Sequence, residues 1–219
     1  MKPIYEIWGL ELYDKIWSST KFSSEQVRLI SGALRECSVI LDLGTGIGTT
    51  AKHLIKEGKT VYSLDISQKS LDYAERRINS TRFHPLQLDA HELAFVNKFD
   101  GAYCASNMSY FENLDLIVSR VHTSLKPKGL FAITGYEKEQ MKKWKELSGQ
   151  ESADAITNGQ IKLGKNEEEL LKYAYQSEVE TRDSSQRTHE ALTNHGGFTI
   201  MRNEKFYQGT SYFVLARKK

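Results

Sequence analysis

An apolar run that leads directly into a glycine-rich loop is the feature that most restricts the fold of this chain. Residues 39–48 read Val-Ile-Leu-Asp-Leu-Gly-Thr-Gly-Ile-Gly, and helical spacing of apolar residues begins at about Thr49. The run is typical of a strand that is covered on both faces. Glycine lets a backbone turn sharply and approach a ligand, and the free N–H groups of a starting helix face that ligand. The segment therefore predicts a strand, a ligand-binding turn and a helix.

Strand-like runs recur along the middle of the chain. Four further runs follow the first one, at residues 61–65, 85–89, 99–106 and 129–134. Segments with helical spacing lie between them, and Ser67 is placed to cap one of these helices. This βαβ repetition predicts an α/β fold with a doubly wound, mostly parallel sheet and right-handed crossovers.

The flanks of this repeating region differ from it. The 219 residues are enough for one domain with a cap. We expect residues 39–134 to form a ligand-binding core and residues 1–36 an N-terminal helical lid, with Ser23-x-x-Gln26 as a capping box. Residues 135–195 are expected to form helical cap segments on the substrate side. The last two strand-like runs, within 196–219, are expected to form a terminal hairpin.

Composition and charge exclude several classes of partner. The net charge of +2 offers no broad attraction for nucleic acid or an anionic membrane. No apolar run approaches the ~20 residues that span a bilayer, and the N-terminus lacks a signal-peptide core. The two cysteines and six histidines show no metal-ligand spacing, so we expect no metal and a cytoplasmic location. The expected partner is a small-molecule substrate, and the expected assembly is a monomer or a homodimer.

The spacing of the loop glycines separates two classes of cofactor. The dinucleotide fingerprint Gly-x-Gly-x-x-Gly, counted from Gly44, requires glycine where this chain has Thr49. The chain instead reads Asp42-x-Gly44-x-Gly46-x-Gly48. An acid beside the loop repels a pyrophosphate but suits a ligand with an ammonium group. With this motif the chain resembles the class I S-adenosylmethionine-dependent methyltransferases, whose first motif is Asp/Glu-x-Gly-x-Gly-x-Gly.

The resemblance implies a fold and a cofactor. The fold is a Rossmann-like seven-stranded sheet with an antiparallel C-terminal hairpin, and the cofactor is S-adenosylmethionine, with S-adenosylhomocysteine as product. The backbone at Gly44, Gly46 and Gly48 would pass close to the methionine and ribose parts of this cofactor. Asp42 would hold the loop or meet the ammonium group through water. Ser106, after the fourth strand, would hold the methionine end through its carbonyl group.

Two further strand ends complete the implied cofactor site. Asp65 lies 21 residues after Gly44 and would accept both ribose hydroxyls, while Ile66 would cover one face of adenine. Asp89 would accept a hydrogen bond from the adenine amino group, and the Ala90 N–H would donate to a ring nitrogen. Taken singly, each acid also fits a turn or a helix cap. Three acids that end consecutive strands around one glycine loop favour the cofactor site.

Further residues resemble the small-molecule branch that is related to quinone and sterol C-methyltransferases. Residues 90–95 read Ala-His-Glu-Leu-Ala-Phe, with Ala94 where that branch usually has proline. Residues 125–129 read Leu-Lys-Pro-Lys-Gly, with Lys128 in place of a glycine. These departures weaken the assignment to a branch and leave the cofactor assignment intact.

The acceptor side of the site is less defined. The methyl group of a sulfonium is already activated, so positioning of the acceptor can supply much of the rate enhancement. Asn107 and Tyr110 follow the fourth strand and are candidate catalytic residues together with Tyr13. Tyr13 lies one helical turn before Trp17, and the two rings can form either a lid or a packing stripe; Tyr110 can likewise be a core residue.

Three functions are compatible with this site. The first is methyl transfer from S-adenosylmethionine to a nitrogen, oxygen or carbon atom of a small molecule. The second is an enzyme that consumes S-adenosylmethionine without intermolecular transfer, such as an intramolecular cyclisation that releases methylthioadenosine. The third is a non-catalytic protein that binds S-adenosylmethionine.

Overall fold

The computed structural model describes residues 9–164, 166–167 and 185–219. Within this part of the chain seven strands form one sheet in the order β3-β2-β1-β4-β5-β7-β6. The strands are β1 (Val39–Leu43), β2 (Thr60–Asp65), β3 (Phe83–Gln87), β4 (Phe99–Ala105), β5 (Leu125–Tyr136), β6 (Phe198–Phe206) and β7 (Ser211–Lys218). Strands β1 to β5 are parallel, and β7 runs antiparallel to both β5 and β6. The predicted mostly parallel sheet with an antiparallel C-terminal pair is confirmed.

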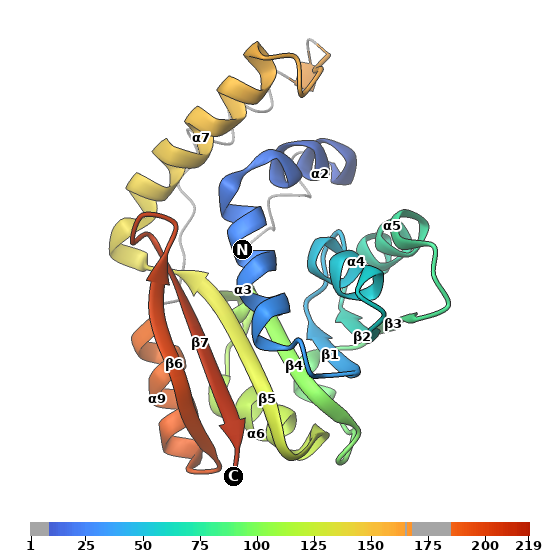
Figure 1. Cartoon of the computed structure of the whole chain (residues 1–219), viewed down its shortest axis with the longest axis vertical. Coiled ribbons are helices and arrows are strands. Elements are labelled where there is room, and N and C mark those ends of the chain that lie inside the picture. Colours follow the sequence, from blue (N-terminus) through green and yellow to red (C-terminus); the bar gives the residue numbers. More distant parts are fainter. Residues whose placement is uncertain (1–8, 165, 168–184) are drawn as a thin grey trace.

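Helices cover both faces of this sheet (Figure 1). They are α2 (Leu10–Ser19), α3 (Lys21–Ala33), α4 (Thr49–Lys56), α5 (Gln68–Ile78), α6 (Leu114–Ser124), α7 (Met141–Thr157) and α9 (Ser185–His195), with short 3₁₀ turns η1 (Ala90–Glu92), η2 (Met108–Tyr110) and η3 (Lys138–Gln140). The Ser67 side chain accepts a hydrogen bond from the Ser70 N–H at the start of α5, so the predicted cap is confirmed.

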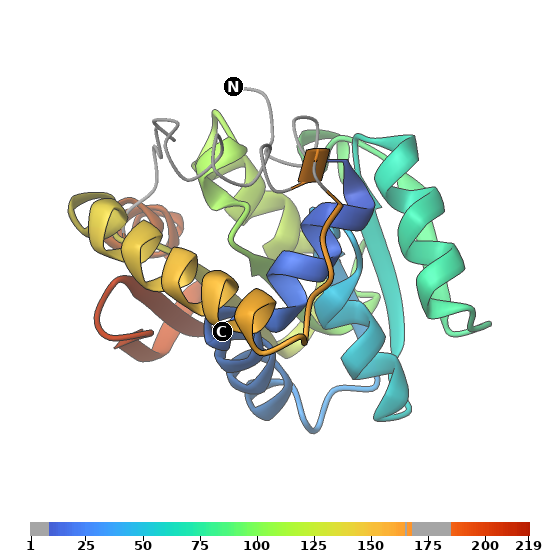
Figure 2. The same cartoon turned by 90° about the horizontal axis from the view of Figure 1, so that it is seen from above.

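Each face of the sheet has its own apolar core. Helices α3, α4 and α5 pack on one face through buried residues that include Ile30, Leu54 and Ala74. Helices α6 and α9 pack on the other face, where Val118 and Leu192 are fully buried. Because β1 is covered on both faces, its residues are apolar in succession rather than in alternation. The result is a three-layer sandwich, which Figure 2 shows from above.

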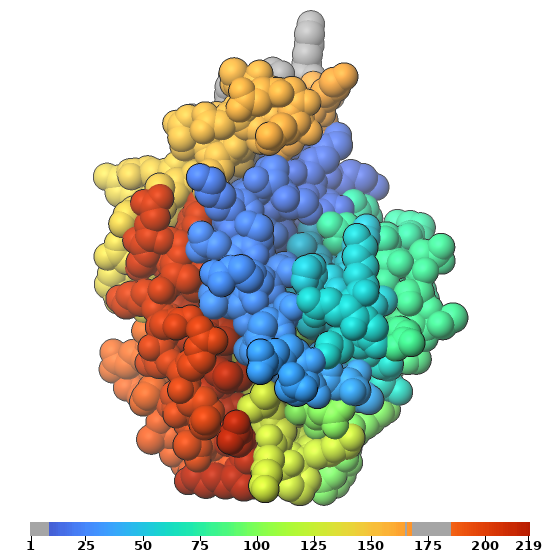
Figure 3. All heavy atoms as spheres, in the orientation of Figure 1, coloured from blue at the N-terminus to red at the C-terminus, as the bar shows by residue number. Residues whose placement is uncertain are grey.

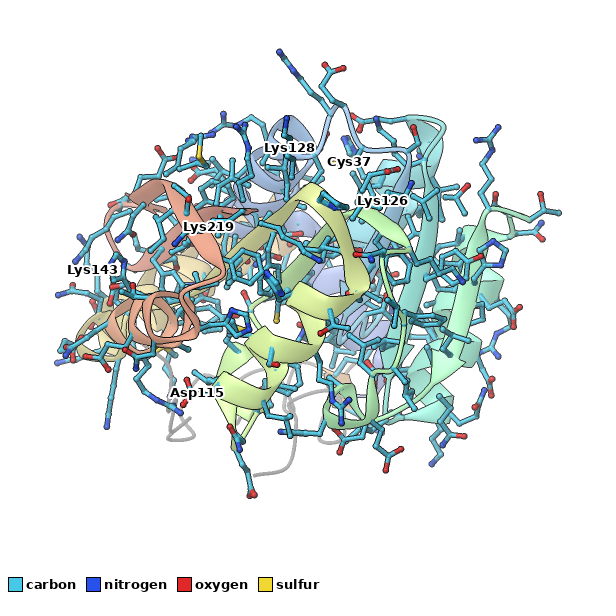
Figure 4. All side chains as sticks on the ribbon, turned by 90° about the horizontal axis from the view of Figure 1, so that it is seen from below. Cys37, Asp115, Lys126, Lys128, Lys143 and Lys219 are labelled. Atoms are coloured by element: carbon cyan, nitrogen blue, oxygen red, sulfur yellow. The ribbon has the colours of Figure 1, made fainter. Side chains whose placement is uncertain are left out.

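The parallel strands place their carboxyl ends at one edge, and the strand order reverses at β1. Strand β1 pairs with β2 on one side and with β4 on the other, so the loops after β1 and β4 diverge to opposite faces. Ligands of open α/β sheets bind at such a switch point, outside the carboxyl ends of the strands. The opposite edge of the sheet carries Lys126 and Lys128 at the start of β5, together with C-terminal Lys219 (Figure 4).

The flanking segments lie above the carboxyl edge. Leu12 and Ile16 of α2 pack against Ala155 of α7 and Ile161, in a small core separate from the sheet. This places part of the expected lid (1–36) against part of the expected cap (135–195). Helix α9, which the prediction also assigned to the cap, instead packs behind the sheet. Residues 1–8, 165 and 168–184 of these two segments lie outside the described residues.

Two element boundaries and one cap differ from the predictions. Strand β3 covers residues 83–87 rather than 85–89, since Phe83 is buried and Pro85 is tolerated in an edge strand. Strand β5 begins at residue 125 rather than 129, directly after α6 ends at Ser124, because Pro127 disfavours a helical backbone at the residue before it. The predicted capping box is wrong: Thr20 caps α3 by accepting from the Ser23 N–H, and Gln26 points elsewhere.

Candidate functional site

The three glycines of the loop after β1 have different roles. All have positive φ angles, +76° at Gly44, +52° at Gly46 and +75° at Gly48, which L side chains rarely adopt. A Cβ at Gly44 would lie 2.8 Å from the Asn107 amide carbon, and one at Gly48 would lie 2.9 Å from Ile78 Cδ1. A Cβ at Gly46 would meet no atom within 4 Å. Packing therefore requires glycine at 44 and 48, whereas Gly46 keeps an open surface free for a ligand.

Asp65 joins this loop to the end of β2. The side chain is buried, and its Oδ2 accepts the Gly46 N–H while Oδ1 accepts the Ser67 N–H, both at 2.9 Å. Burial raises the pKa of Asp65, and the hydrogen bonds from backbone N–H groups oppose that rise. Each carboxylate oxygen keeps a second lone pair, so the group can still accept hydrogen bonds from two hydroxyls of a ligand. The next residue, Ile66, is 70% exposed and presents apolar surface beside the acid.

Asp42 lies beneath the loop rather than on its open side. The residue is 1% exposed, and its Oδ2 accepts a hydrogen bond from Ser63 Oγ at 2.9 Å. Burial raises the pKa of Asp42 to about 6, although the hydroxyls of Thr45, Tyr103 and Ser63 act in the opposite direction. This placement favours a role in holding the loop over a direct contact with a ligand.

Asp89 and Ala90 follow β3 at the start of η1. Asp89 Oδ1 accepts the His91 N–H at 2.9 Å and lies 2.6 Å from His91 Nδ1. These hydrogen bonds lower the pKa of Asp89 and favour the ionised carboxylate, both oxygens of which act only as acceptors. Asp89 is exposed and Ala90 is buried. The pair thus offers a carboxylate at the surface next to a backbone turn.

The ends of β4 and β5 are held together by a buried amide that the sequence analysis assigned to a cap. Gln26 of α3 is 2% exposed, and its Nε2 donates to Ser106 Oγ at 2.6 Å and to Thr134 Oγ1 at 2.9 Å. Ser106 has a φ angle of +60°, and its N–H donates to the Thr134 carbonyl. The available signal was the position of Gln26 on the apolar face of α3, one turn after Phe22 and before Ile30.

Asn107 bridges the switch point of the sheet. Its Nδ2 donates to the Gly44 carbonyl at 2.6 Å and to the Ala105 carbonyl at 3.0 Å. The amide therefore fixes the glycine loop against the end of β4, which is a positioning role. Tyr110, at the end of η2, is 47% exposed. Both predicted residues lie on the segment after β4, and of the two Tyr110 has the accessible ring.

Tyr13 belongs to an aromatic cluster above the carboxyl edge. The rings of Tyr13 and Trp17 stack with centroids 5.5 Å apart, and Trp17 packs edge-on against Phe22 at 5.2 Å. Phe22 in turn contacts Tyr136 at 5.4 Å and Trp144 at 5.6 Å. The cluster joins α2, α3, β5 and α7, so these rings serve packing, and Tyr13 is the half-buried member at its outer end.

An ion pair fastens α2 to α5 next to the loop. Arg77 Nε lies 2.7 Å from Asp14 Oδ2, and a second guanidinium nitrogen donates to Asp14 Oδ1 at 2.8 Å. Tyr73 Oη donates to the same carboxylate at 3.0 Å. Arg77 also donates to the Ile47 carbonyl in the glycine loop. The N-terminal lid and the loop are thereby coupled through one side chain.

Within residues 9–164, 166–167 and 185–219, no three His, Cys, Asp or Glu side chains gather as they would around a metal ion. No helix in this part of the chain is both long and apolar enough to cross a bilayer.

Comparison with known proteins relates the core of the chain to a family. A family profile described as "Methyltransferase domain" matches residues 40–129, which contain the glycine loop and the three strand-end acids. The match supports a relation of this core to the class I S-adenosylmethionine-dependent methyltransferases. It agrees with the resemblance carried by the glycine motif.

Individual relatives of this chain are distant. It is 27% identical over 158 residues to phosphoethanolamine N-methyltransferase 2 of Caenorhabditis elegans, covering 66% of this chain and 36% of the relative. It is 25% identical over 189 residues to sterol 24-C-methyltransferase of Pneumocystis carinii, covering 78% of this chain and 49% of the relative. The chain thus spans half or less of the length of these relatives.

A solved structure shares the whole fold. The N-methyltransferase NodS of Bradyrhizobium japonicum, in complex with S-adenosylhomocysteine, superposes with a TM-score of 0.67 at 12% identity. The superposition covers 99% of this chain and 99% of NodS. At this identity the likeness concerns the fold alone.

Proposed function

We propose that this protein transfers a methyl group from S-adenosylmethionine to a small-molecule acceptor. The observation that carries the proposal is the arrangement of Gly46 and Asp65 at the switch point of the sheet. Gly46 leaves open space above the loop, and Asp65 is tied to its N–H, so the carboxylate is held at the edge of that space. An acid held beside an open glycine turn can accept hydrogen bonds from the ribose of a nucleoside. It also disfavours a ligand with a phosphate at this loop, because like charges repel.

The residues present fit the cofactor in their chemistry. S-adenosylmethionine, when bound, supplies an activated methyl group on sulfur. Asp65 would accept the ribose hydroxyls, exposed Ile66 would cover the adenine ring, and the ionised Asp89 carboxylate would accept the adenine amino group. Ala90 and Ser106 would contribute backbone groups at the two ends of the molecule.

We place the acceptor on the segment after β4. Tyr110 is exposed there, and Asn107 fixes the loop next to it, so Tyr110 would contact the acceptor and Asn107 would position the donor. Tyr13 would close the site from the lid. The names of two relatives describe methylation of phosphoethanolamine and of a sterol, one on nitrogen and one on carbon, which supports small molecules as the acceptor class. We expect the protein to act in the cytoplasm, as a monomer or homodimer.

Calorimetric titration with S-adenosylmethionine and S-adenosylhomocysteine tests the donor site. Hydrogen bonds to charged groups contribute ~1.5–3 kcal/mol, so Asp65→Ala should weaken both affinities by ~10- to 100-fold. Asp115→Ala, an exposed acid on α6, is the matched control and should bind like the parent protein. Absence of binding below millimolar cofactor would remove the proposal, and an unchanged affinity of Asp65→Ala would remove Asp65 from the ribose role.

Incubation of the protein with S-adenosylmethionine alone, and then with a panel of small amines, phenols and enols, tests the transfer. Formation of S-adenosylhomocysteine that depends on an added acceptor supports methyl transfer. Release of methylthioadenosine without any acceptor would contradict it and indicate intramolecular chemistry on the cofactor.

A further inference from the structure

A groove lies between α3 and α4, on the face of the molecule shown in Figure 3. Its volume is about 610 Å³, within the range of pockets that hold small molecules. Successive turns of α3 and α4 form the two walls, and Arg77 of α5 closes the end near α2. The open surface at Gly46 and the exposed carboxylate of Asp89 contribute nothing to its lining, so the groove is a separate feature from the donor site.

The lining of this groove is strongly basic. Arg28 comes from α3, Lys52 and Lys56 come from α4, and Arg77 comes from α5. The acid that lines the groove, Glu57, is already engaged: both of its oxygens accept from Ser31 Oγ, at 2.8 and 2.9 Å, and His53 lies 3.2 Å from it. The groove therefore holds more positive charge than its own acid can balance.

Three of these cations lack a direct partner in the described part of the chain. Arg77 is paired with Asp14, but Arg28, Lys52 and Lys56 have no hydrogen-bond or ion-pair partner among the described residues. Burial, together with repulsion from Arg77 and Lys56, lowers the pKa of Lys52. Helices α3 and α4 thus hold these positive charges near one another along the same groove.

This concentration of charge differs from an ordinary solvated surface. The whole chain has a net charge of only +2, yet one groove gathers three unpaired cations. A ligand with two or more negative charges would relieve their mutual repulsion and raise the local stability. We propose that this groove binds a small organic phosphate or diphosphate, as a second site distinct from the methyl donor site.

The chemistry of the lining fits a phosphoryl group. The guanidinium of Arg28 can bind two phosphate oxygens at once, while the two ammonium groups act as point charges. Ser18 and Ser24 also line the groove, but their hydroxyls already donate to Asp14 Oδ1 and to the Lys21 carbonyl, so the cations are left to bind the phosphoryl group. Arg77, which closes the groove, also donates to the Ile47 carbonyl, so an occupied groove contacts a side chain that holds the glycine loop.

Calorimetric titration with pyrophosphate, combined with ¹⁵N NMR of the backbone amides, tests this proposal without any need for methyl transfer. We expect saturable binding below ~1 mM and shifts confined to α3, α4 and Arg77. Arg28→Ala and Lys52→Ala should each weaken binding at least ~10-fold, because a hydrogen bond to a charged group is lost. Lys142→Ala, an exposed lysine on α7, removes the same charge elsewhere and should leave the affinity unchanged.

Several outcomes would overturn the proposal. The first is a titration that pyrophosphate does not saturate. The second is an affinity for pyrophosphate that is unchanged in both Arg28→Ala and Lys52→Ala. The third is a loss of affinity in Lys142→Ala that equals the loss in the groove variants. Titrations with inorganic phosphate and with glycerol phosphate then distinguish a free anion from an organic phosphate as the preferred form. A single-stranded RNA that binds the groove more tightly than pyrophosphate would replace the small ligand by a nucleic acid and refute this assignment.

Discussion

The buried carboxyl group of Asp42 should make the stability of this protein depend on pH in an unusual direction. Burial raises its pKa from 3.8 to about 6. Between these two values the folded state binds more protons than the unfolded state, so this group lowers the free energy of unfolding as the pH rises through that window. The difference of about 2 pKa units corresponds to about 3 kcal/mol, which is fully present only well below pH 3.8; about 2 kcal/mol of it is lost between pH 4 and pH 7.

Asp42→Asn removes this ionisation and keeps the shape of the side chain. Urea unfolding of both proteins without cofactor, at pH 4, 5, 6 and 7, measures the effect. The free energy of unfolding of the variant, minus that of the parent protein, should rise by about 2 kcal/mol from pH 4 to pH 7. The other carboxyl groups are common to both proteins and cancel in this difference.

A matched variant keeps the test specific. Asp115→Asn changes an exposed acid on α6, and its difference from the parent protein should stay within ~0.5 kcal/mol at every pH. If the Asp42→Asn curve runs parallel to that of the parent protein between pH 4 and pH 7, Asp42 is ionised without penalty. The reasoning from burial would then be refuted.

Three further perturbations test how the site is built. Gly44→Ala should lower the free energy of unfolding more than Gly46→Ala, because only a Cβ at position 44 collides with Asn107. Gly46→Ala should chiefly lower the affinity for S-adenosylmethionine that calorimetry measures. Gln26→Leu leaves the hydroxyls of Ser106 and Thr134 without their amide donor and should cost ~1–3 kcal/mol in urea unfolding. A double-mutant cycle of Asp14→Asn and Arg77→Met should give a coupling energy of ~0.5–3 kcal/mol, since both side chains are less than one-fifth exposed.

Each of these has a contrary outcome. Equal stability losses at Gly44 and Gly46 would mean that the contact with Asn107 does not restrict the loop. A neutral Gln26→Leu would show that the two hydroxyls find other partners. Additive effects of the Asp14 and Arg77 variants would mean that the ion pair between α2 and α5 is too well solvated to fasten the lid.

Much of the sheet could be predicted because its signals are local. Val39–Leu43 is apolar at every position but one, and the loop that follows contains three glycines at alternate positions. Such patterns depend on neighbours in the chain, so they predict the strand, the turn and the helix together. Strand β3 was displaced by two residues because its position depends on pairing with β2 at the edge of the sheet, which no local pattern reports.

The side-chain contacts across the site could not be predicted in the same way. Asn107 reaches Gly44 over 63 positions, and Gln26 reaches Ser106 over 80. The ion pair of Asp14 with Arg77 joins α2 to α5, which two helices, two strands and the glycine loop separate in sequence. These contacts depend on the order in which the strands lie in the sheet, so Asn107 was interpreted as catalytic and Gln26 as a helix cap.

The sequence by itself determined the class of fold and predicted the kind of ligand at the carboxyl edge. It could do so because the spacing of Gly44, Gly46 and Gly48 and the acid two residues earlier are constraints within a single turn. The tertiary structure decided what each of these residues contacts. It buried Asp42 beneath the loop, tied Asp65 to Gly46, and brought Arg28, Lys52 and Lys56 into one groove. Burial and charge proximity arise only when helices pack on a sheet, and they set the pKa values and the surface charge of this protein.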